Sequence, residues 1–190
     1  MQDLGGLASR GLDWLGFIFV EASPRYCDSE PLGTPGGLRR FGVFQDASTE
    51  EMIATAQAWR LHGVQLHGSE TADEARALRS EGLTVLKALH VASEAVLAEA
   101  QDRYPADSVD YFVFDSPGGG TGRAFAWDWL QAYRGTTPFL LAGGIGPGHG
   151  ALLREVRHPR WVGVDLNSRF ETAPGVKDLS RVQEFLEHEL

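Results

Sequence analysis

The chain has 190 residues, of which 43% are hydrophobic, so we expect residues 1–190 to bury one core and form a single domain. Its 26 acidic and 17 basic side chains leave a formal net charge of -9, which argues against nucleic acid and anionic membrane surfaces as partners. A small phosphorylated ligand is compatible with this charge, because backbone amides can hold one phosphate.

The first predicted element is a helix-like stretch at residues 4–10. After it, short apolar runs recur along the chain, each bounded by Gly, Pro or Asp, which is typical of buried strands in a parallel sheet. Seven such strands are predicted, at residues 15–19, 41–44, 63–66, 84–89, 111–114, 139–142 and 161–164.

Segments with helical spacing lie between these strands. Some begin with a hydroxyl residue followed three positions later by Glu or Gln, which is the pattern of a capping box. Such pairs are Ser48 with Glu51, Thr71 with Glu74, and Ser180 with Gln183, and Ser93 precedes a further helix. The chain therefore alternates strand and helix throughout.

Seven strand–helix units fit either a doubly wound open sheet or a (β/α)8 barrel. The stretch at residues 4–10 has no strand before it, and 190 residues is just under the roughly 200 residues at the lower end of barrel sizes. We therefore expect an α/β fold of the (β/α)8 TIM barrel class, N-terminally truncated so that strand 1 is missing. Two unpaired sheet edges should make such a chain poorly stable.

The C-terminal ends of barrel strands build the active site, so the residues after each run are candidates for function. Gly143-Gly144 and Asn167-Ser168 follow the last two strands, where barrels commonly bind phosphate. A tight turn that needs positive φ would also explain the two glycines. Asp115 ends an earlier strand, where burial favours the protonated carboxyl that suits a general acid, although an Asp that caps the next turn is the alternative.

Three other polar residues stand at or near strand ends. Arg25 could clamp a planar carboxylate through two parallel hydrogen bonds, or it could be a solvated surface residue. His67 is expected to hydrogen-bond to neighbouring loops rather than to catalyse. Lys87 suggests either a Schiff-base lysine or an ion pair with an interior carboxylate such as Asp115. The glycines at residues 118–122 predict a mobile lid or, more simply, a flexible surface loop.

As a set, these motifs resemble those of the phosphoribosylanthranilate isomerases, (β/α)8 enzymes of tryptophan biosynthesis. The resemblance covers nearly the whole chain and keeps the family's order and spacing. The matching segments are residues 16–19 (Gly-Phe-Ile-Phe), 23–26 (Ser-Pro-Arg-Tyr), 42–44, 64–68 (Val-Gln-Leu-His-Gly), 87–88, 119–123 (Gly-Gly-Thr-Gly-Arg), 141–144 (Leu-Ala-Gly-Gly) and 173–178.

This resemblance implies an Amadori rearrangement of N-(5-phosphoribosyl)anthranilate to 1-(2-carboxyphenylamino)-1-deoxyribulose 5-phosphate, with no cofactor and no metal. A general acid protonates the ring oxygen, and a general base then removes the C2′ proton. Carried over residue by residue, the resemblance makes Asp115 the general acid and Arg25 the anchor of the anthranilate carboxylate. It assigns the phosphate to Gly143, Gly144, Asn167 and Ser168.

The family's general base is a cysteine in a Lys-(Ile/Val)-Cys-Gly motif at the end of strand one, and this sequence has no counterpart. In relatives, the residues that follow Cys-Gly resemble Met1-Gln2-Asp3. We therefore interpret Met1 as an internal methionine and expect the missing strand to end only a few residues before it. A truncated gene is the alternative.

Other departures concern single residues. Cys27 could replace the missing base, but it lies on a different loop, beyond Arg25, and proton transfer tolerates little misplacement. Arg169 stands where many relatives have Gly, and Ala126 replaces a usual Asp, so ligand affinity could differ, with Arg169 as a possible extra phosphate contact.

Two other functions are kept as alternatives: an inactive ligand-binding remnant that lacks the catalytic cysteine, and another phosphate-binding barrel enzyme of the same pathway. The Ser-Pro-Arg-Tyr and Gly-Gly-Thr-Gly-Arg loops argue against the second. Cys27 is the single cysteine, and the sequence shows neither a targeting segment nor an apolar stretch of about 18 residues, so we expect a cytoplasmic monomer or homodimer.

Overall fold

The computed structural model describes residues 11–29, 36–116 and 127–190. Three features of the sequence therefore lie outside the described residues: the predicted helix at 4–10, the glycine-rich stretch at 118–122, and Ala126.

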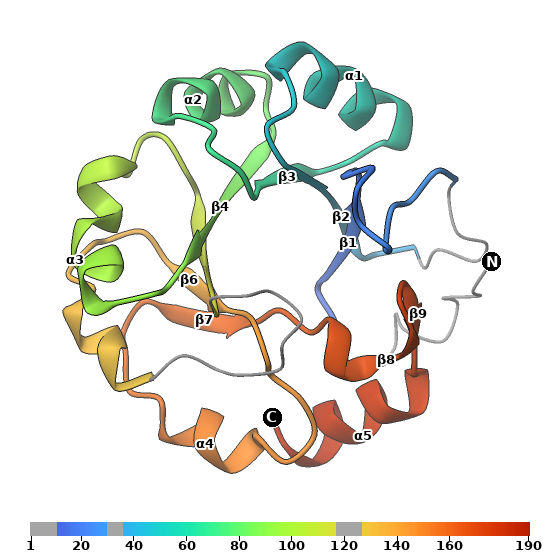
Figure 1. Cartoon of the computed structure of the whole chain (residues 1–190), viewed down its shortest axis with the longest axis vertical. Coiled ribbons are helices and arrows are strands. Elements are labelled where there is room, and N and C mark those ends of the chain that lie inside the picture. Colours follow the sequence, from blue (N-terminus) through green and yellow to red (C-terminus); the bar gives the residue numbers. More distant parts are fainter. Residues whose placement is uncertain (1–10, 30–35, 117–126) are drawn as a thin grey trace.

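The described chain is built on one curled parallel sheet, which has helices on its outer side (Figure 1). Its order is the order of the sequence, and each strand coincides with one of the predicted apolar runs, so the predicted α/β class with a parallel sheet is confirmed. The seven strands are β1 (Trp14–Ile18), β2 (Arg39–Phe44), β3 (Gly63–Leu66), β4 (Thr84–His90), β5 (Tyr111–Asp115), β6 (Phe139–Leu141) and β7 (Trp161–Val164).

From β2 onward a helix lies between successive strands of the sheet, and the helices cover the outside of the curl (Figure 1). A small antiparallel pair, β8 (Glu171–Ala173) and β9 (Val176–Lys177), follows β7. The α-helices are α1 (Thr49–Trp59), α2 (Ala72–Ser80), α3 (Glu94–Arg103), α4 (Gly150–Glu155) and α5 (Leu179–His188), and the 3-10 helices are η1 (Trp127–Ala132) and η2 (Ser168–Phe170). Across the described part of the chain, no helix has both the length and the apolar character needed to cross a membrane.

Two of the predicted helix starts are confirmed. Thr71 and Glu74 form a full capping box: the Glu74 amide donates to the Thr71 hydroxyl at 3.3 Å, and the Thr71 amide donates to the Glu74 carboxylate at 2.6 Å. The Ser48 hydroxyl accepts a hydrogen bond from the Glu51 amide at 3.1 Å, so Ser48 caps α1.

The predicted capping box of Ser180 with Gln183 is wrong. The last helix begins at Leu179, and Asp178 is its N-cap, accepting from the Arg181 amide at 3.1 Å. Asp is as strong an N-cap as Ser, and Asp178 comes two residues before Ser180, so the helix begins earlier than the Ser180 pattern predicts. Ser180 instead lies in the first turn, where its hydroxyl donates to Asp178 at 2.6 Å.

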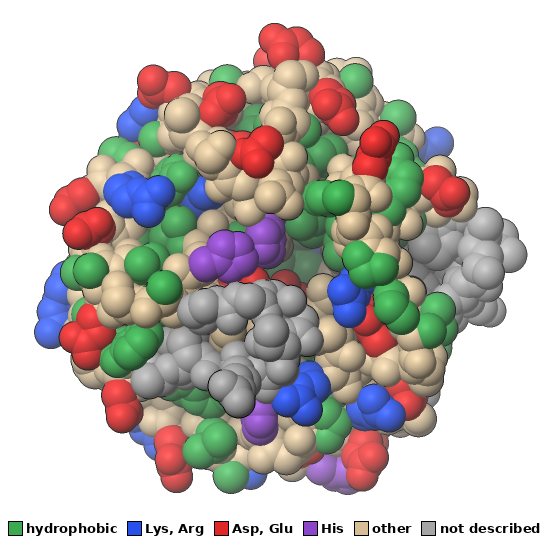
Figure 2. All heavy atoms as spheres, viewed as in Figure 1, with side chains coloured by type: hydrophobic (Ala, Val, Ile, Leu, Met, Phe, Trp, Pro, Cys, Tyr) green, Lys and Arg blue, Asp and Glu red, His purple; other side chains and the backbone are tan. Residues whose placement is uncertain are grey.

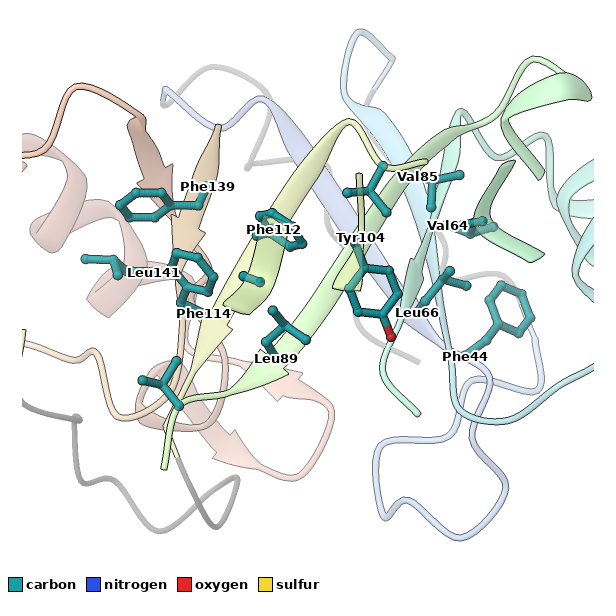
Figure 3. Packing of buried hydrophobic residues seen from close by; sticks show 14 of the residues in the cluster. Phe44, Val64, Leu66, Val85, Leu89, Tyr104, Phe112, Phe114, Phe139 and Leu141 are labelled. Atoms are coloured by element: carbon teal, nitrogen blue, oxygen red, sulfur yellow. The ribbon is translucent and has the colours of Figure 1, made fainter. Parts of the chain in front are cut away.

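Alternate residues of each strand face either the helices or the inside of the curl. On the helix side, buried aromatic rings of β5 and β6 pack together, with Phe114 and Phe139 4.7 Å apart between ring centroids (Figure 3). Facing the inside, Phe41, Leu86 and Val113 form a second, smaller cluster. The helix side therefore supplies most of the core.

The inside of the curl is a wide, open cavity of about 1690 Å³. Its walls run from residues at the start of strands, such as Trp14 and Tyr111, to residues at strand ends, such as Asp115. Closed parallel barrels fill this space with layers of side chains. In the sheet order of the described residues, β1 and β7 are the two end strands.

Lys87 of β4 forms an ion pair with a buried carboxylate, as one hypothesis predicted, but its partner is Glu70 rather than Asp115. It faces the helix layer and is buried beside Glu70, with 1% of each side chain exposed. Its ammonium donates to the Glu70 carboxylate at 2.8 Å and to the Gly68 carbonyl at 2.6 Å. Burial lowers the pKa of Lys87, although the charge of Glu70 opposes this shift. Neither a Schiff base nor a pair with Asp115 fits this position.

Replacing Lys87 with Met should destabilise the protein strongly, because Glu70 would stay buried without its cation. We expect the free energy of unfolding to fall by about 3–5 kcal/mol, measured by urea denaturation. Arg76→Met is the matched control: it removes an exposed cation paired with Asp73 and Asp107, and it should change stability little. Equal losses in the two variants would contradict a special role for the buried pair.

Candidate active site

All the residues predicted from the sequence to form the site line the same cavity. Parallel pairing turns the carboxyl ends of the seven strands toward one rim, and the loops that follow them meet there. The residues in question are Arg25, Asp115, Gly143, Gly144, Asn167 and Ser168, and His67 lines the cavity as well. The sequence prediction of which residues come together is therefore matched by their position, whereas their roles stay predictions.

Asp115 is the last residue of β5 and is 7% exposed. Its backbone carbonyl accepts a hydrogen bond from the Val91 amide at 2.8 Å, which ties it to the end of the neighbouring strand. One carboxylate oxygen, Oδ2, lies 3.7 Å from the Nε2 atom of His67 and 3.7 Å from the Nδ1 atom of His90. Asp115 is therefore a buried carboxyl whose side chain faces two imidazoles.

The glycine pair after β6 is required by its backbone. Gly143 has φ +74° and Gly144 has φ +71°, in the left-handed region that favours glycine. A Cβ atom on Gly143 would lie 2.3 Å from the Oδ1 atom of Asp115, so a larger residue would collide with the candidate acid. The tight-turn interpretation is confirmed, and phosphate binding at the same turn stays a prediction.

Arg25 belongs to a network of charges rather than to the open surface. Its Nε atom donates to both oxygens of Glu171, at 2.9 and 3.1 Å, and the Glu171 side chain is 4% exposed. Lys177 donates to Glu171 at 2.9 Å and to the Oδ1 atom of Asn167 at 2.6 Å. Glu171 thus joins the predicted carboxylate anchor to a predicted phosphate-binding residue.

His67 hydrogen-bonds to a neighbour, as expected for a histidine at a strand end. Its Nδ1 atom lies 3.3 Å from the side-chain nitrogen of Gln65, and its ring lies 5.2 Å from that of His90. Burial lowers the pKa of His67, and the charge of His90 adds to this effect while Asp115 opposes it. Burial therefore favours the neutral form of the His67 imidazole. Figure 2 shows histidine and acidic side chains together near the middle of this face.

Cys27 does not have the properties of a substitute base. Its thiol donates to the Ser29 carbonyl at 3.3 Å. Burial raises the pKa of Cys27, and the charge of Asp28 raises it further, against a smaller opposing effect of the Ser29 backbone. A thiol of raised pKa is protonated at neutral pH, so it is a poor proton acceptor.

Three residues at this rim were not assigned a role from the sequence: His90, Asp165 and Glu171. Asp165 follows β7 and lines the cavity. Burial raises the pKa of Asp165, with Lys177 opposing and Asp115 adding to the shift. Asp165 could have been predicted as a site residue from its place after a strand. Glu171 could not, because its role depends on contacts with residues distant in the sequence.

The fold and the rim define a class of protein, namely an α/β enzyme of barrel type. A buried carboxyl, a guanidinium and a glycine turn converge on one cavity at the carboxyl ends of parallel strands. Similarities to known proteins agree with this class and make it specific.

Residues 1–188 match the family described as "N-(5'phosphoribosyl)anthranilate (PRA) isomerase". An N-(5'-phosphoribosyl)anthranilate isomerase of Phocaeicola vulgatus is 44% identical over 188 residues, which cover 97% of this chain and 91% of the relative. The Parabacteroides distasonis enzyme of the same name is 36% identical over 195 residues, covering 98% of this chain and 87% of the relative. The chain therefore belongs to the phosphoribosylanthranilate isomerase family.

Solved structures of this family have the same fold. The Thermus thermophilus enzyme superposes with a TM-score of 0.79 at 28% identity, covering 93% of this chain and 87% of that one. A second structure, described as a complex with reduced 1-(o-carboxyphenylamino)-1-deoxyribulose 5-phosphate, gives a TM-score of 0.73 at 25% identity, with the same two coverages.

Glu171→Gln should reduce stability in a pH-dependent way. Burial alone would raise the pKa of Glu171, but Lys177 and Arg25 outweigh it, so the pKa is lowered in the folded state. Its ionised form therefore stabilises the fold above the unfolded pKa of about 4.3, and this contribution disappears as pH falls through the lower folded value. We expect the variant to be less stable than the native chain at pH 7, and the difference to narrow at pH 3.

Urea denaturation at the two pH values measures this difference. Glu184→Gln, an exposed position on α5, is the matched control and should follow the native chain at both. A stability difference for Glu171→Gln that is equally large at pH 7 and pH 3 would contradict the ionised network.

Proposed function

We propose that this cavity carries out the Amadori rearrangement of N-(5'-phosphoribosyl)anthranilate to 1-(2-carboxyphenylamino)-1-deoxyribulose 5-phosphate, the isomerase step of tryptophan biosynthesis. The observation that carries this proposal is the convergence of Asp115, Arg25 and the turns at residues 143–144 and 167–168 on one cavity. A related structure described as a complex with a reduced form of the product supports the same ligand class. The substrate is a phosphorylated small molecule.

Asp115 is the proposed general acid. Its proton goes to the furanose ring oxygen, the bond between that oxygen and C1′ breaks, and the ring opens to a protonated Schiff base. A general base then takes the C2′ proton, which leaves an enolamine that tautomerises to the ketone. The position of Asp115 in the lining of the cavity supports this role, because a general acid must come within hydrogen-bonding reach of the substrate atom that it protonates.

Arg25 is the proposed anchor of the anthranilate carboxylate. Glu171 holds it through Nε, so the two terminal nitrogens of the guanidinium are left to form parallel hydrogen bonds with a planar carboxylate. This geometry supports a ligand-binding role for Arg25 over the alternative of a solvated surface residue. Arg25 therefore orients the aromatic end of the substrate.

Gly143, Gly144, Asn167 and Ser168 are the proposed phosphate-binding residues. The two glycines lie at a turn whose backbone can approach a ligand closely, and Asn167 is fixed by the ammonium of Lys177. The phosphate would then lie at the carboxyl ends of β6 and β7, where (β/α)8 barrels commonly bind it.

In the complete protein, Asp115→Asn should abolish turnover and leave ligand binding largely intact, because the amide fills the same space but cannot give up a proton in the same way. We expect kcat to fall by about a hundredfold to ten-thousandfold. Affinity for reduced 1-(o-carboxyphenylamino)-1-deoxyribulose 5-phosphate, measured by calorimetry, should change little. Asp102→Asn, on the exposed side of α3, is the control and should keep full activity. Retained turnover would remove Asp115 from the mechanism.

We further infer that the complete fold is one (β/α)8 barrel domain, in which an eighth strand lies between β7 and β1 and ends in the catalytic Cys-Gly. Two observations support this: the open cavity inside the curl, and the position of β1 and β7 at the two ends of the sheet order of the described residues. The raised pKa of Cys27 also argues that the base comes from elsewhere.

Adding a strand that ends in Cys-Gly before residue 1 should raise both stability and activity. The extended chain should unfold at a higher temperature and isomerise substrate, whereas residues 1–190 alone should do neither well. Differential scanning calorimetry and a fluorescence assay of N-(5'-phosphoribosyl)anthranilate turnover measure the two effects. An added strand ending in Ala-Gly is the control, because it should restore stability without activity. Efficient turnover by residues 1–190 alone would refute this account of the base.

The alternative is an inactive remnant that binds the same ligand without converting it. That protein would bind the reduced product analogue yet stay inactive even with the added strand, so the same experiment separates the two.

We place the reaction in the cytoplasm, supported by the single cysteine of the sequence. We propose that the protein is a monomer or a homodimer, and a relative from Thermotoga maritima is described as dimeric.

A further inference from the structure

The cluster of His67, His90 and Asp115 contains more ligand chemistry than the isomerase reaction uses. One nitrogen from each imidazole and one carboxylate oxygen all lie within 4.8 Å of one another. The three residues come from the ends of β3, β4 and β5, and the parallel register pairs His90 directly with Asp115. The cluster is thus fixed by neighbouring strands rather than by loose loops.

The spacing fits a divalent transition-metal ion. Nitrogen and oxygen ligands bind Zn²⁺ at about 2.0–2.2 Å, which puts ligand atoms roughly 3.3 Å apart in a tetrahedral site. Both imidazoles here lie 3.7 Å from the same carboxylate oxygen, so a few tenths of an ångström separate them from that spacing. The His90 side chain is half exposed and can rotate to close the remaining gap to His67.

The surroundings of His67 also fit metal binding. Its Nε2 atom points to Asp115, and its other ring nitrogen, Nδ1, lies 3.3 Å from the side-chain amide of Gln65. When Nε2 binds a metal, Nδ1 carries the proton and needs an acceptor, which the amide oxygen of Gln65 can supply after the amide turns over. Metal-binding histidines commonly have such a partner for the second nitrogen.

We propose that His67, His90 and Asp115 form a binding site for Zn²⁺ or a similar divalent transition-metal ion, and that the bound ion inhibits the isomerase. The inhibition rests on the proposed function, because the ion takes the Asp115 carboxylate oxygen that would otherwise carry the catalytic proton. A fourth position, left to water or to an oxygen of the ligand, completes the coordination. The ion therefore acts as an inhibitor, because it occupies the oxygen through which Asp115 would donate its proton.

Direct binding is tested first, without any turnover. Zn²⁺ is titrated calorimetrically into the 190-residue chain in a buffer that does not chelate metal, with His90→Gln as the test variant. His188→Gln, an exposed histidine at the end of α5, is the matched control. We expect one ion per native chain, an affinity at least about tenfold weaker in His90→Gln, and no change in the control. No binding, or equal binding by all three proteins, would overturn the site.

Inhibition is tested next, in whichever form of the chain isomerises substrate. Each protein is compared with its own activity without metal, so that any effect of the substitution itself cancels. Zn²⁺ should inhibit the native protein and the His188→Gln control at the concentration where it binds, and His90→Gln should need at least about tenfold more. Binding without inhibition would overturn the inhibitory role. If neither the 190-residue chain nor the chain with the added strand isomerises substrate, the proposed function is contradicted, while the calorimetry would still decide the metal site.

Discussion

Parallel strand pairing is the constraint on which this molecule depends. Because every strand runs in the same direction, every strand ends at the same rim, and residues far apart in the sequence become neighbours there. The register between β4 and β5 places His90 beside Asp115. The Ala142 amide, directly after β6, donates to the Phe114 carbonyl of β5, and the glycine turn that follows therefore lies against the Asp115 carboxylate. The site is therefore a consequence of register more than of loop conformation.

The buried pair of Lys87 and Glu70 supports this rim from the helix side. Glu70 accepts hydrogen bonds from the amides of Asp46 and Gly68, at 2.8 and 2.9 Å, so one carboxylate fixes the loops that follow β2 and β3. Asp46 has a φ of +56°, a strained conformation for a residue with a side chain. A costly buried charge is thus used to hold two loops, one of which directly follows His67.

The sequence was sufficient for what depends on local pattern and insufficient for what depends on long-range contact. Apolar runs located all seven strands, and the capping box at Thr71 located the start of α2, because both signals lie within a few residues. The partner of Lys87 was missed, since periodicity does not show which face of a strand meets a helix. Glu171 was missed because its contact with Arg25 joins residues 146 positions apart.

The sharing of Glu171 between Arg25 and Lys177 links the two ends of the cavity thermodynamically. A ligand group that draws Arg25 away from Glu171 changes the charge that Lys177 faces, and Lys177 in turn holds Asn167. With the proposed roles of Arg25 and Asn167, occupancy at one end alters the affinity at the other by the same factor in both directions. A carboxylate fragment would then change the affinity for a phosphate fragment, so that the cavity would respond to the two ends of its proposed substrate together.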